Sequence, residues 1–247
     1  AWATFASRTN LVGNYAIATR SKANSTDMSI DPVGLARVIA YNRISIQVYT
    51  GSSWVNIPAT PIRSGKSIAY VALALDKMGL PTVAWYESVS NMPTDYELHV
   101  ARWNGSAWQK LGNVLATESI FSRYISLDIE IDPYNRPVVA SDLNVARWNG
   151  SSWVKLGQSQ IAHAPDIAFD NNNRLIVVSA FGKDGQGAPL GRLTVNRWTA
   201  SGWLQLGGNL DIYDTDPLAR TSKPYINVDS SNRPVVTWGE QSFANPN

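Results

Sequence analysis

The sequence predicts an all-β fold made of repeated four-stranded units, and two alternating sequence blocks support this prediction. One block has paired tryptophans around a short polar turn, and the other has an aspartate-led turn between two apolar segments. No segment shows the apolar period of an amphipathic helix. Internal repeats of this kind are typical of propellers and solenoids.

The tryptophan block is clearest at residues 102–112, which read Arg-Trp-Asn-Gly-Ser-Ala-Trp-Gln-Lys-Leu-Gly. It returns at 147–157, more weakly at 197–207, and as a further copy at 49–54. An Asn-Gly pair between apolar residues is the strongest short hairpin signal, because a type I′ turn needs positive φ at both central positions. Each copy therefore predicts a strand, a two-residue turn and a second strand.

The aspartate block predicts the other two strands of each unit. An apolar segment ends at an aspartate, a polar turn follows, and a segment rich in β-branched residues comes next. Aspartate suits the first position of such a turn, because its side chain accepts hydrogen bonds from the backbone beyond it. The copies cover residues 30–41, 74–85, 130–140, 168–178 and 227–238.

The number of copies predicts a five-bladed β-propeller of four-stranded antiparallel blades, formed by residues 1–247 as a single domain. There are five aspartate blocks but only four clear tryptophan blocks. We expect residues 1–14 to supply the missing hairpin, so that both chain termini complete the last blade. A ring closed in this way leaves no open sheet edge, and open edges invite aggregation.

Composition favours an extracellular or cell-surface protein. Hydrophobic residues make up 44% of the chain, which argues against disorder, and charged residues make up 16%, below the usual quarter. Ser, Thr, Asn and Gly must therefore cover much of the surface. The net charge of +2 is too small to suggest a nucleic-acid partner.

We expect neither a cofactor nor a metal. The chain has no cysteine, which excludes disulfides and thiolate ligands, and its two histidines make a multi-histidine centre unexpected. The aspartate turns lack the later glutamate of a complete calcium loop, so they are interpreted as plain turns. No apolar run reaches the roughly 18 residues that a membrane span needs.

The motif R-W-N-G-x-x-W…L-G at 102–112 and 147–157 resembles the blades of bacterial extracellular propeller repeats. This resemblance implies a secreted or surface protein. More distantly, the architecture is similar to small propeller lectins. No lectin-specific motif carries over, so a lectin function rests on analogy of fold.

Any ligand site is expected on the face that carries the long connections. With strands named A to D from the axis outward, the short A–B and C–D turns share one face. The B–C and D–A connections vary in length and share the other, where binding residues usually lie. Candidate ligand-binding residues in or just after the D–A connections are Lys22, Lys66, Tyr70, Arg123, Tyr124, His163, Lys223 and Tyr225.

Two of these expectations have a plainer alternative. The basic residues could form an anion site, or they could be ordinary charges that balance acidic residues, namely Asp27, Asp166, Asp214 and Asp216. The paired tryptophans could stack on sugars, or they could pack between blades. Their strict recurrence favours packing for Trp103, Trp148 and Trp198, whereas Trp108, Trp153 and Trp203 are expected to be more exposed.

The favoured function is a non-catalytic extracellular module that recognises carbohydrate or a cell surface through the long-loop face. Its partner would be a glycan or another cell-surface ligand. The alternative is a structural or protein-interaction scaffold of a surface assembly, with another surface protein as partner. A glycoside hydrolase is less favoured, because it needs two carboxylates at a defined separation. The carboxylates Glu87, Glu118, Asp142 and Glu240 are available, but no spacing selects a pair.

Overall fold

The chain forms β-sheets throughout the part that the computed structural model describes. All 22 strands belong to sheets, and this part of the chain contains no helix. Accordingly, none of its segments is a helix with the length and apolar character needed to cross a membrane. The described residues are 14–20, 26–31, 35–40, 44–49, 53–57, 68–89, 95–113, 115–119, 126–142, 144–157, 163–183, 189–210 and 219–241.

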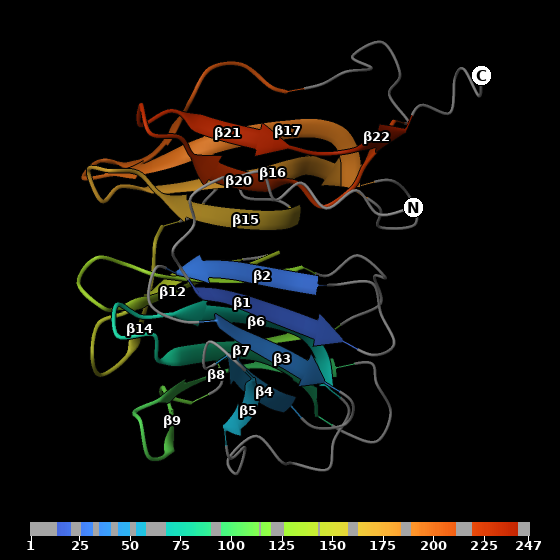
Figure 1. The fold of residues 1–247 in the computed structure, drawn as a ribbon. Helices are drawn as coiled ribbons and strands as arrows, with labels where there is room; N and C mark the ends of the chain where they lie inside the picture. Colours follow the sequence, from blue (N-terminus) through green and yellow to red (C-terminus); the bar gives the residue numbers. More distant parts are fainter. Residues whose placement is uncertain are drawn as a thin grey trace.

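Three units confirm the predicted blade of four antiparallel strands (Figure 1). In each unit the aspartate block forms the first two strands and the tryptophan block forms the third and fourth. We call them the second, third and fourth blades. Their strands are β6 (Ile68–Leu75), β7 (Pro81–Ser88), β8 (Asp95–Trp103) and β9 (Trp108–Lys110); β11 (Leu127–Ile131), β12 (Pro137–Ser141), β13 (Val145–Trp148) and β14 (Trp153–Lys155); and β15 (His163–Phe169), β16 (Leu175–Lys183), β17 (Pro189–Thr199) and β18 (Gly202–Gln205). In the second blade, β10 (Ala116–Ser119) also pairs with β8.

The aspartate turns form as predicted. The Oδ1 atom of Asp132 accepts hydrogen bonds from the backbone N–H groups of Tyr134 and Arg136, both at 2.9 Å. Asn135 then takes a positive φ of 65°, as in a type I turn followed by a bulge. The same pair of bonds to Oδ1 occurs at three further aspartates, Asp76, Asp170 and Asp229.

The tryptophan hairpins form, but the predicted type I′ Asn-Gly turn is wrong. Trp103 pairs with Trp108, and the two central residues are Gly105 and Ser106. Gly105 has a φ of 98°, whereas Asn104 does not adopt positive φ. Its Oδ1 instead accepts the N–H groups of Ser106 and Ala107, at 2.9 and 2.8 Å. The turn is therefore displaced by one residue, because the asparagine side chain caps it.

The tryptophan pairs lie between blades, as predicted for the first tryptophan of each pair. Trp148 and Trp153 pack against the apolar cluster shared by the second and third blades. Trp153 Nε1 donates to the Leu111 carbonyl of the preceding blade at 2.7 Å, and a Cβ on Gly112 would lie 3.1 Å from Trp148. The Leu-Gly step of one blade thus receives the tryptophan pair of the next.

Two further pairs follow the same packing rule. Trp198 and Trp203 pack against the cluster between the third and fourth blades. Trp103 packs against the cluster that contains Trp108 and Ile46. Trp108 was expected to be more exposed, and this expectation is wrong. Only 7% of Trp108 is exposed, because it contacts the preceding sheet.

The first sheet departs from the predicted blade. Its order is β2-β1-β3-β4-β5, so β1 lies between two strands that we expected to pair directly. The segment alternates Tyr15, Ile17 and Thr19, all strand-forming residues, and the repeat count did not include it. The bounds are β1 (Asn14–Arg20), β2 (Thr26–Asp31), β3 (Leu35–Ala40), β4 (Ile44–Tyr49) and β5 (Trp54–Ile57).

The last aspartate block forms a long hairpin. Its strands β20 (Tyr225–Val228) and β21 (Pro234–Thr237) continue as β19 (Arg220–Thr221) and β22 (Glu240–Gln241). Residues 1–13, expected to complete this blade, lie outside the described residues, and Asn14 pairs with Asp31 of β2 instead. Closure of a five-bladed ring by both termini therefore stays a prediction.

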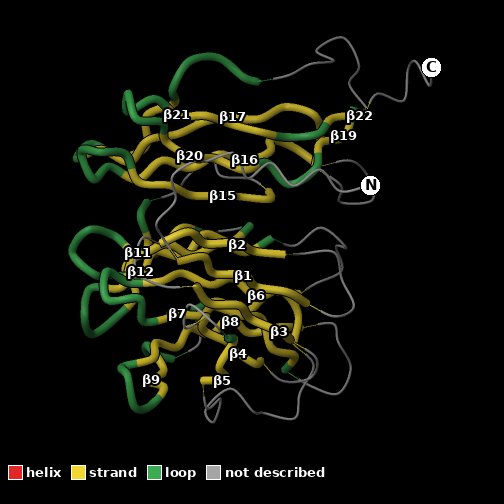
Figure 2. Tube along the Cα trace, viewed as in Figure 1, coloured by secondary structure: helices red, strands yellow, loops and turns green. Residues whose placement is uncertain are grey.

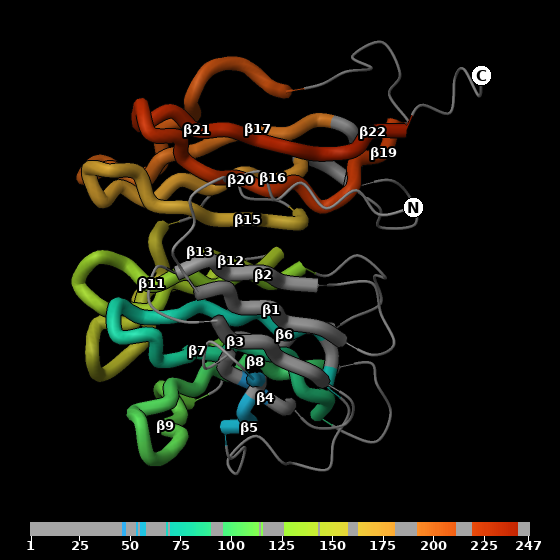
Figure 3. Tube along the Cα trace, in the orientation of Figure 1, coloured from blue at the N-terminus to red at the C-terminus, as the bar shows by residue number. Residues whose placement is uncertain are grey.

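The first strands of consecutive blades line the centre of the molecule. β6 contacts β11, β11 contacts β15, and β15 contacts β20. The colour sequence in Figure 3 shows that blades adjacent in the chain are adjacent in space. In Figure 2 the short turns between strands lie mainly on the left. The first strand of each blade ends at such a turn, so these strands start at the opposite end.

Candidate functional site

Four of the eight candidate ligand-binding residues can be placed. Lys22, Lys66, Arg123 and Tyr124 lie outside the described residues. The others lie at or just before the starts of central strands β6, β15 and β20, at the end opposite the short turns. We call this end the axial mouth. The residues placed there are Tyr70, His163, Lys223 and Tyr225.

Lys223 connects three blades at the axial mouth. Its Nζ lies 3.6 Å from Asp166 Oδ1 of the fourth blade and donates to the Leu127 carbonyl of the third blade at 3.4 Å. It also lies 5.6 Å from the ring centroid of Tyr225, which is a cation–π contact. The sequence left two interpretations of the basic residues, an anion site or charges that balance acidic residues. Lys223 fits the second, because it pairs with Asp166.

Two buried aspartates join neighbouring blades around the axis, and sequence reasoning did not assign this role. Asp128 Oδ2 accepts the backbone N–H of Ile167 from the next blade at 2.8 Å. Asp166 Oδ2 does the same for Ile226 of the following blade, also at 2.8 Å. Both aspartates lie four positions before a turn aspartate, so alignment of the repeats could have revealed them.

Tyr70 belongs partly to the core. It has a φ of 44° where β6 bulges against β7, and its half-buried ring packs against the cluster between the second and third blades. This contact limits its use as an open stacking surface. The equivalent residue in β15 is Ala164, also with positive φ (51°), and its neighbour His163 is half-buried.

Tyr225 presents an exposed aromatic ring at this end. Half of the residue is exposed (50%), and it begins β20 at the position that Asp128 and Asp166 occupy in the preceding blades. An aromatic ring therefore replaces a carboxylate in the last repeat. It lies beside Lys223, which gives the axial mouth an aromatic face and a neighbouring ammonium group.

The carboxylates considered for hydrolysis are engaged in internal bonds where their side chains are described. Glu118 lies in β10 and its side chain is not described. Within the described part of the chain, no cluster of His, Cys, Asp or Glu could hold a metal ion. The bonds run from Trp85 Nε1 to Glu87 at 3.3 Å, from Trp238 Nε1 to Glu240 at 3.2 Å and from the Ala164 N–H to Asp142 at 3.1 Å.

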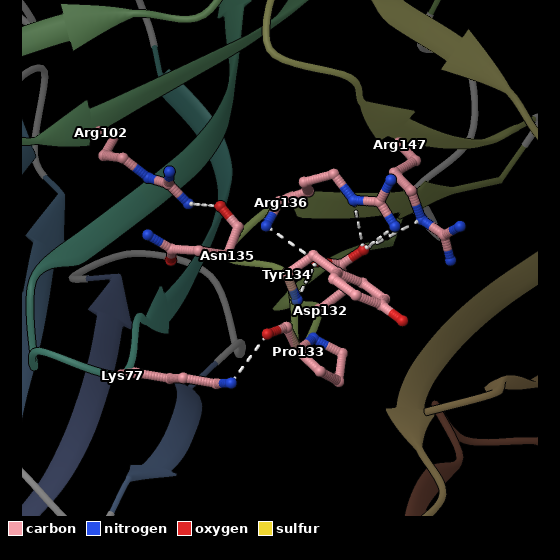
Figure 4. Close-up of polar contacts among 8 residues, drawn as sticks. All are labelled: Lys77, Arg102, Asp132, Pro133, Tyr134, Asn135, Arg136 and Arg147. Carbon is pink, nitrogen blue, oxygen red and sulfur yellow. Dashed lines mark hydrogen bonds and ion pairs between the residues drawn. The ribbon is translucent and has the colours of Figure 1, made fainter. Parts of the chain in front are cut away.

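A second charged region lies on the opposite face, at the short turns. Asp132 receives Arg136 from its own turn, with Nε and Nη2 both at 2.7 Å from Oδ2. Arg147 of the tryptophan block approaches the same oxygen at 3.5 Å. Figure 4 shows the two guanidinium groups converging on Asp132 beside the ring of Tyr134.

The short turns of neighbouring blades are also bonded to each other. Lys77 Nζ donates to the Pro133 carbonyl at 2.7 Å, and Arg102 Nη2 donates to the Asn135 carbonyl at 2.9 Å (Figure 4). Burial lowers the pKa of the Arg102 guanidinium, and the carboxylates of Asp76 and Asp132 partly offset this effect. Sequence reasoning interpreted these turns only as connections.

Comparison with known proteins gives the fold context alone. No protein-family model matches the chain, and no curated protein matches it in sequence. The chain is similar in structure to the Aleuria aurantia lectin, described as a six-bladed β-propeller with a novel fucose recognition mode. The identity is 12%, with 94% of this chain and 96% of that one covered and a TM-score of 0.47.

Other similar structures include a second lectin and an enzyme. The SapL1 lectin in complex with α-methyl fucoside is 14% identical, with 93% of this chain and 74% of that one covered and a TM-score of 0.47. An endo-arabinanase of Bacillus licheniformis is 12% identical, with 89% and 95% covered and a TM-score of 0.40. Likenesses this weak carry no argument about blade number, ligand or catalysis.

Proposed function

We propose that the protein is a non-catalytic extracellular module that binds a glycan at the axial mouth. The observation that carries this proposal is the exposed ring of Tyr225 with Lys223 beside it, at the end of the central strands opposite the short turns. An aromatic face can stack on a sugar ring, while the ammonium group beside it favours polyhydroxylated ligands. The candidate residues Lys22, Lys66, Arg123 and Tyr124 would extend this surface.

The internal bonds of the carboxylates support a binding role over hydrolysis. Glu87 and Glu240 each accept a bond from a tryptophan two residues earlier in the same strand region, and Asp142 accepts a backbone N–H. A glycosidase would need one carboxyl group as an acid and a second as a base or nucleophile, both facing the substrate. A scaffold role in a surface assembly is the alternative if no glycan binds.

Glycan-array binding of Tyr225 variants tests this proposal. We expect Tyr225→Ala to lose about tenfold or more in glycan affinity, because stacking and cation–π contacts are together worth about 1–2 kcal/mol. Tyr225→Phe should retain most of the affinity, because it keeps the ring. Since Tyr225 is exposed, both variants should melt close to the parent. Equal binding by the two variants, or no glycan binding by the parent, would leave the scaffold role ahead.

We further propose that residues 1–14 complete the last blade and close a five-bladed ring. The repeat count supports this closure, since the chain has five aspartate blocks but only four clear tryptophan blocks. A further hairpin at the edge of β21 would then complete the last blade.

Deletion of residues 1–13 is expected to lower the melting temperature by more than about 5 °C, because it would unpair this edge. Deletion of residues 242–247, which have no part in the proposed closure, is the matched control and should have little effect. A melting curve for the N-terminal deletion that coincides with that of the parent would exclude this closure.

A further inference from the structure

On the short-turn face, two arginines share one carboxylate in each of two consecutive blades. Asp132 is bound through two nitrogens by Arg136, and Asp170 is bound at its turn by Arg174, whose Nε lies 2.7 Å from Oδ2. A second arginine of the tryptophan block then approaches each carboxylate. Arg147 lies 3.5 Å from Asp132 and Arg197 lies 3.7 Å from Asp170.

These second arginines are incompletely satisfied. Among the described residues, the ion pair is the single polar contact of each, and it is made by the buried Nε atom. Because a ligand cannot reach Nε, only the terminal nitrogens of Arg147 and Arg197 could bind one. In Figure 4 the terminal nitrogens of Arg147 point away from Asp132.

The second blade shows how the same arginine can be satisfied internally. Arg102 Nε donates to Thr82 Oγ1 at 3.1 Å, and Thr82 is its cross-strand partner. The corresponding cross-strand partner of Arg147 is Val138, and that of Arg197 is Ile176. These aliphatic side chains cannot accept a hydrogen bond from Nε. Among the described residues, the terminal nitrogens of Arg147 and Arg197 also lack a bond like that of Arg102 Nη2 to the Asn135 carbonyl, so they are free to bind a ligand.

An added anion would stabilise the charged form of the Arg147 guanidinium. Burial lowers the pKa of the Arg147 guanidinium, Asp132 offsets this effect in part, and the like charge of Arg136 adds to it. The side chains of Arg147 and Arg197 remain 20% and 19% exposed, so a ligand can reach them. Guanidinium groups bind carboxylate and sulfate through two parallel hydrogen bonds.

We propose that Arg147 and Arg197 form two equivalent oxyanion sites on the short-turn face, which bind the sulfate or carboxylate groups of an acidic polysaccharide. In the third blade, Tyr134 adds a 72% exposed ring, held 5.0 Å below the guanidinium of Arg136, on which a sugar can stack. Asn172 takes the place of Tyr134 in the fourth blade. One chain of sugars that carries repeated charges can occupy both sites and gain effective concentration.

The decisive variant removes the paired donors without changing charge. In the double variant Arg147→Lys/Arg197→Lys, each side chain keeps its positive charge but loses the planar guanidinium that binds an oxyanion through two parallel hydrogen bonds. We expect its affinity for immobilised dextran sulfate to fall about tenfold, because a hydrogen bond to a charged group is worth about 1.5 kcal/mol or more. Arg147→Gln/Arg197→Gln should lose at least as much. The parent should bind dextran sulfate and polygalacturonate, but not neutral dextran.

The matched control is Lys110→Gln/Lys155→Gln, which changes the net charge as much as the arginine variant but on exposed outer strands. It should reduce affinity less than about twofold, as expected for exposed charges. An equal loss in this control, unchanged binding by the lysine variant, or a parent that does not prefer dextran sulfate over dextran overturns the proposal. Binding of inorganic sulfate alone, without polymer binding, also overturns it. Tyr225→Ala should leave dextran sulfate binding unchanged, which separates these sites from the axial mouth.

Discussion

Replacement of Trp148 with alanine is expected to destabilise the fold by about 3–5 kcal/mol, as for other large-to-small changes in cores. Trp148 packs against the cluster between the second and third blades and contacts Gly112 and its own partner Trp153, whose ring centroid is 5.4 Å away. Its loss leaves a cavity at the junction of two blades. Urea unfolding followed by tryptophan fluorescence and circular dichroism measures the change.

Two further substitutions make this experiment specific. Trp198→Ala removes the equivalent ring from the next junction and should cost a similar amount, because Trp198 packs in the same way near Gly157. Tyr134→Ala removes an aromatic ring that is mostly exposed and should change stability by less than about 0.5 kcal/mol. If Trp148→Ala unfolds as the parent does, the ring does not form part of the blade junction.

The repeat itself was predictable because its signals are local. The aspartate turns depend on contacts within five residues, such as Asp132 with Tyr134 and Arg136, and each copy repeats them. The packing role of Trp148 followed from strict recurrence. The tryptophan turn was misassigned for an equally local reason, since Asn104 can either occupy a left-handed position or cap the turn with its side chain. Sequence alone did not decide between these two options.

Contacts between blades were less predictable, because they join residues far apart in the chain. Asp128 and Ile167 are separated by 39 positions, and Asp166 and Ile226 by 60. Pattern reasoning identified Lys223 by its place before a central strand, and its partners depend on how three blades meet. The insertion of β1 between β2 and β3 is likewise a pairing that no repeat period encodes.

The two faces of the molecule use charge differently, which bears on where ligands bind. At the axial mouth, Lys223 pairs with Asp166 and donates to the Leu127 carbonyl. Any part that Lys223 plays in ligand binding therefore depends on the same contacts that hold the blades together. On the short-turn face, the terminal nitrogens of Arg147 and Arg197 make no hydrogen bond within the described part of the chain. Anion binding should therefore depend on the short-turn arginines more than on Lys223.

Substitution of Asp166 with alanine is expected to cost about 2–3 kcal/mol, because it leaves a buried N–H without an acceptor and removes a hydrogen bond to a charged group. Asp166 is buried, and its two oxygens serve Ile226 and Lys223 separately. Both partners belong to the last blade, so the alanine variant should loosen that blade first. Hydrogen exchange should then show faster exchange in β20 than in β11.

Asp166→Asn separates the two functions of this carboxylate, because an amide oxygen can still accept the Ile226 N–H but carries no charge. We expect Asp166→Asn to cost less than half as much as Asp166→Ala, since Lys223 is 26% exposed and its ion pair is worth at most about 1 kcal/mol. A double-mutant cycle with Lys223→Gln should give a coupling of that size. If the asparagine and alanine variants are equally unstable, the charge of Asp166, and not its bond to Ile226, holds the last blade in place.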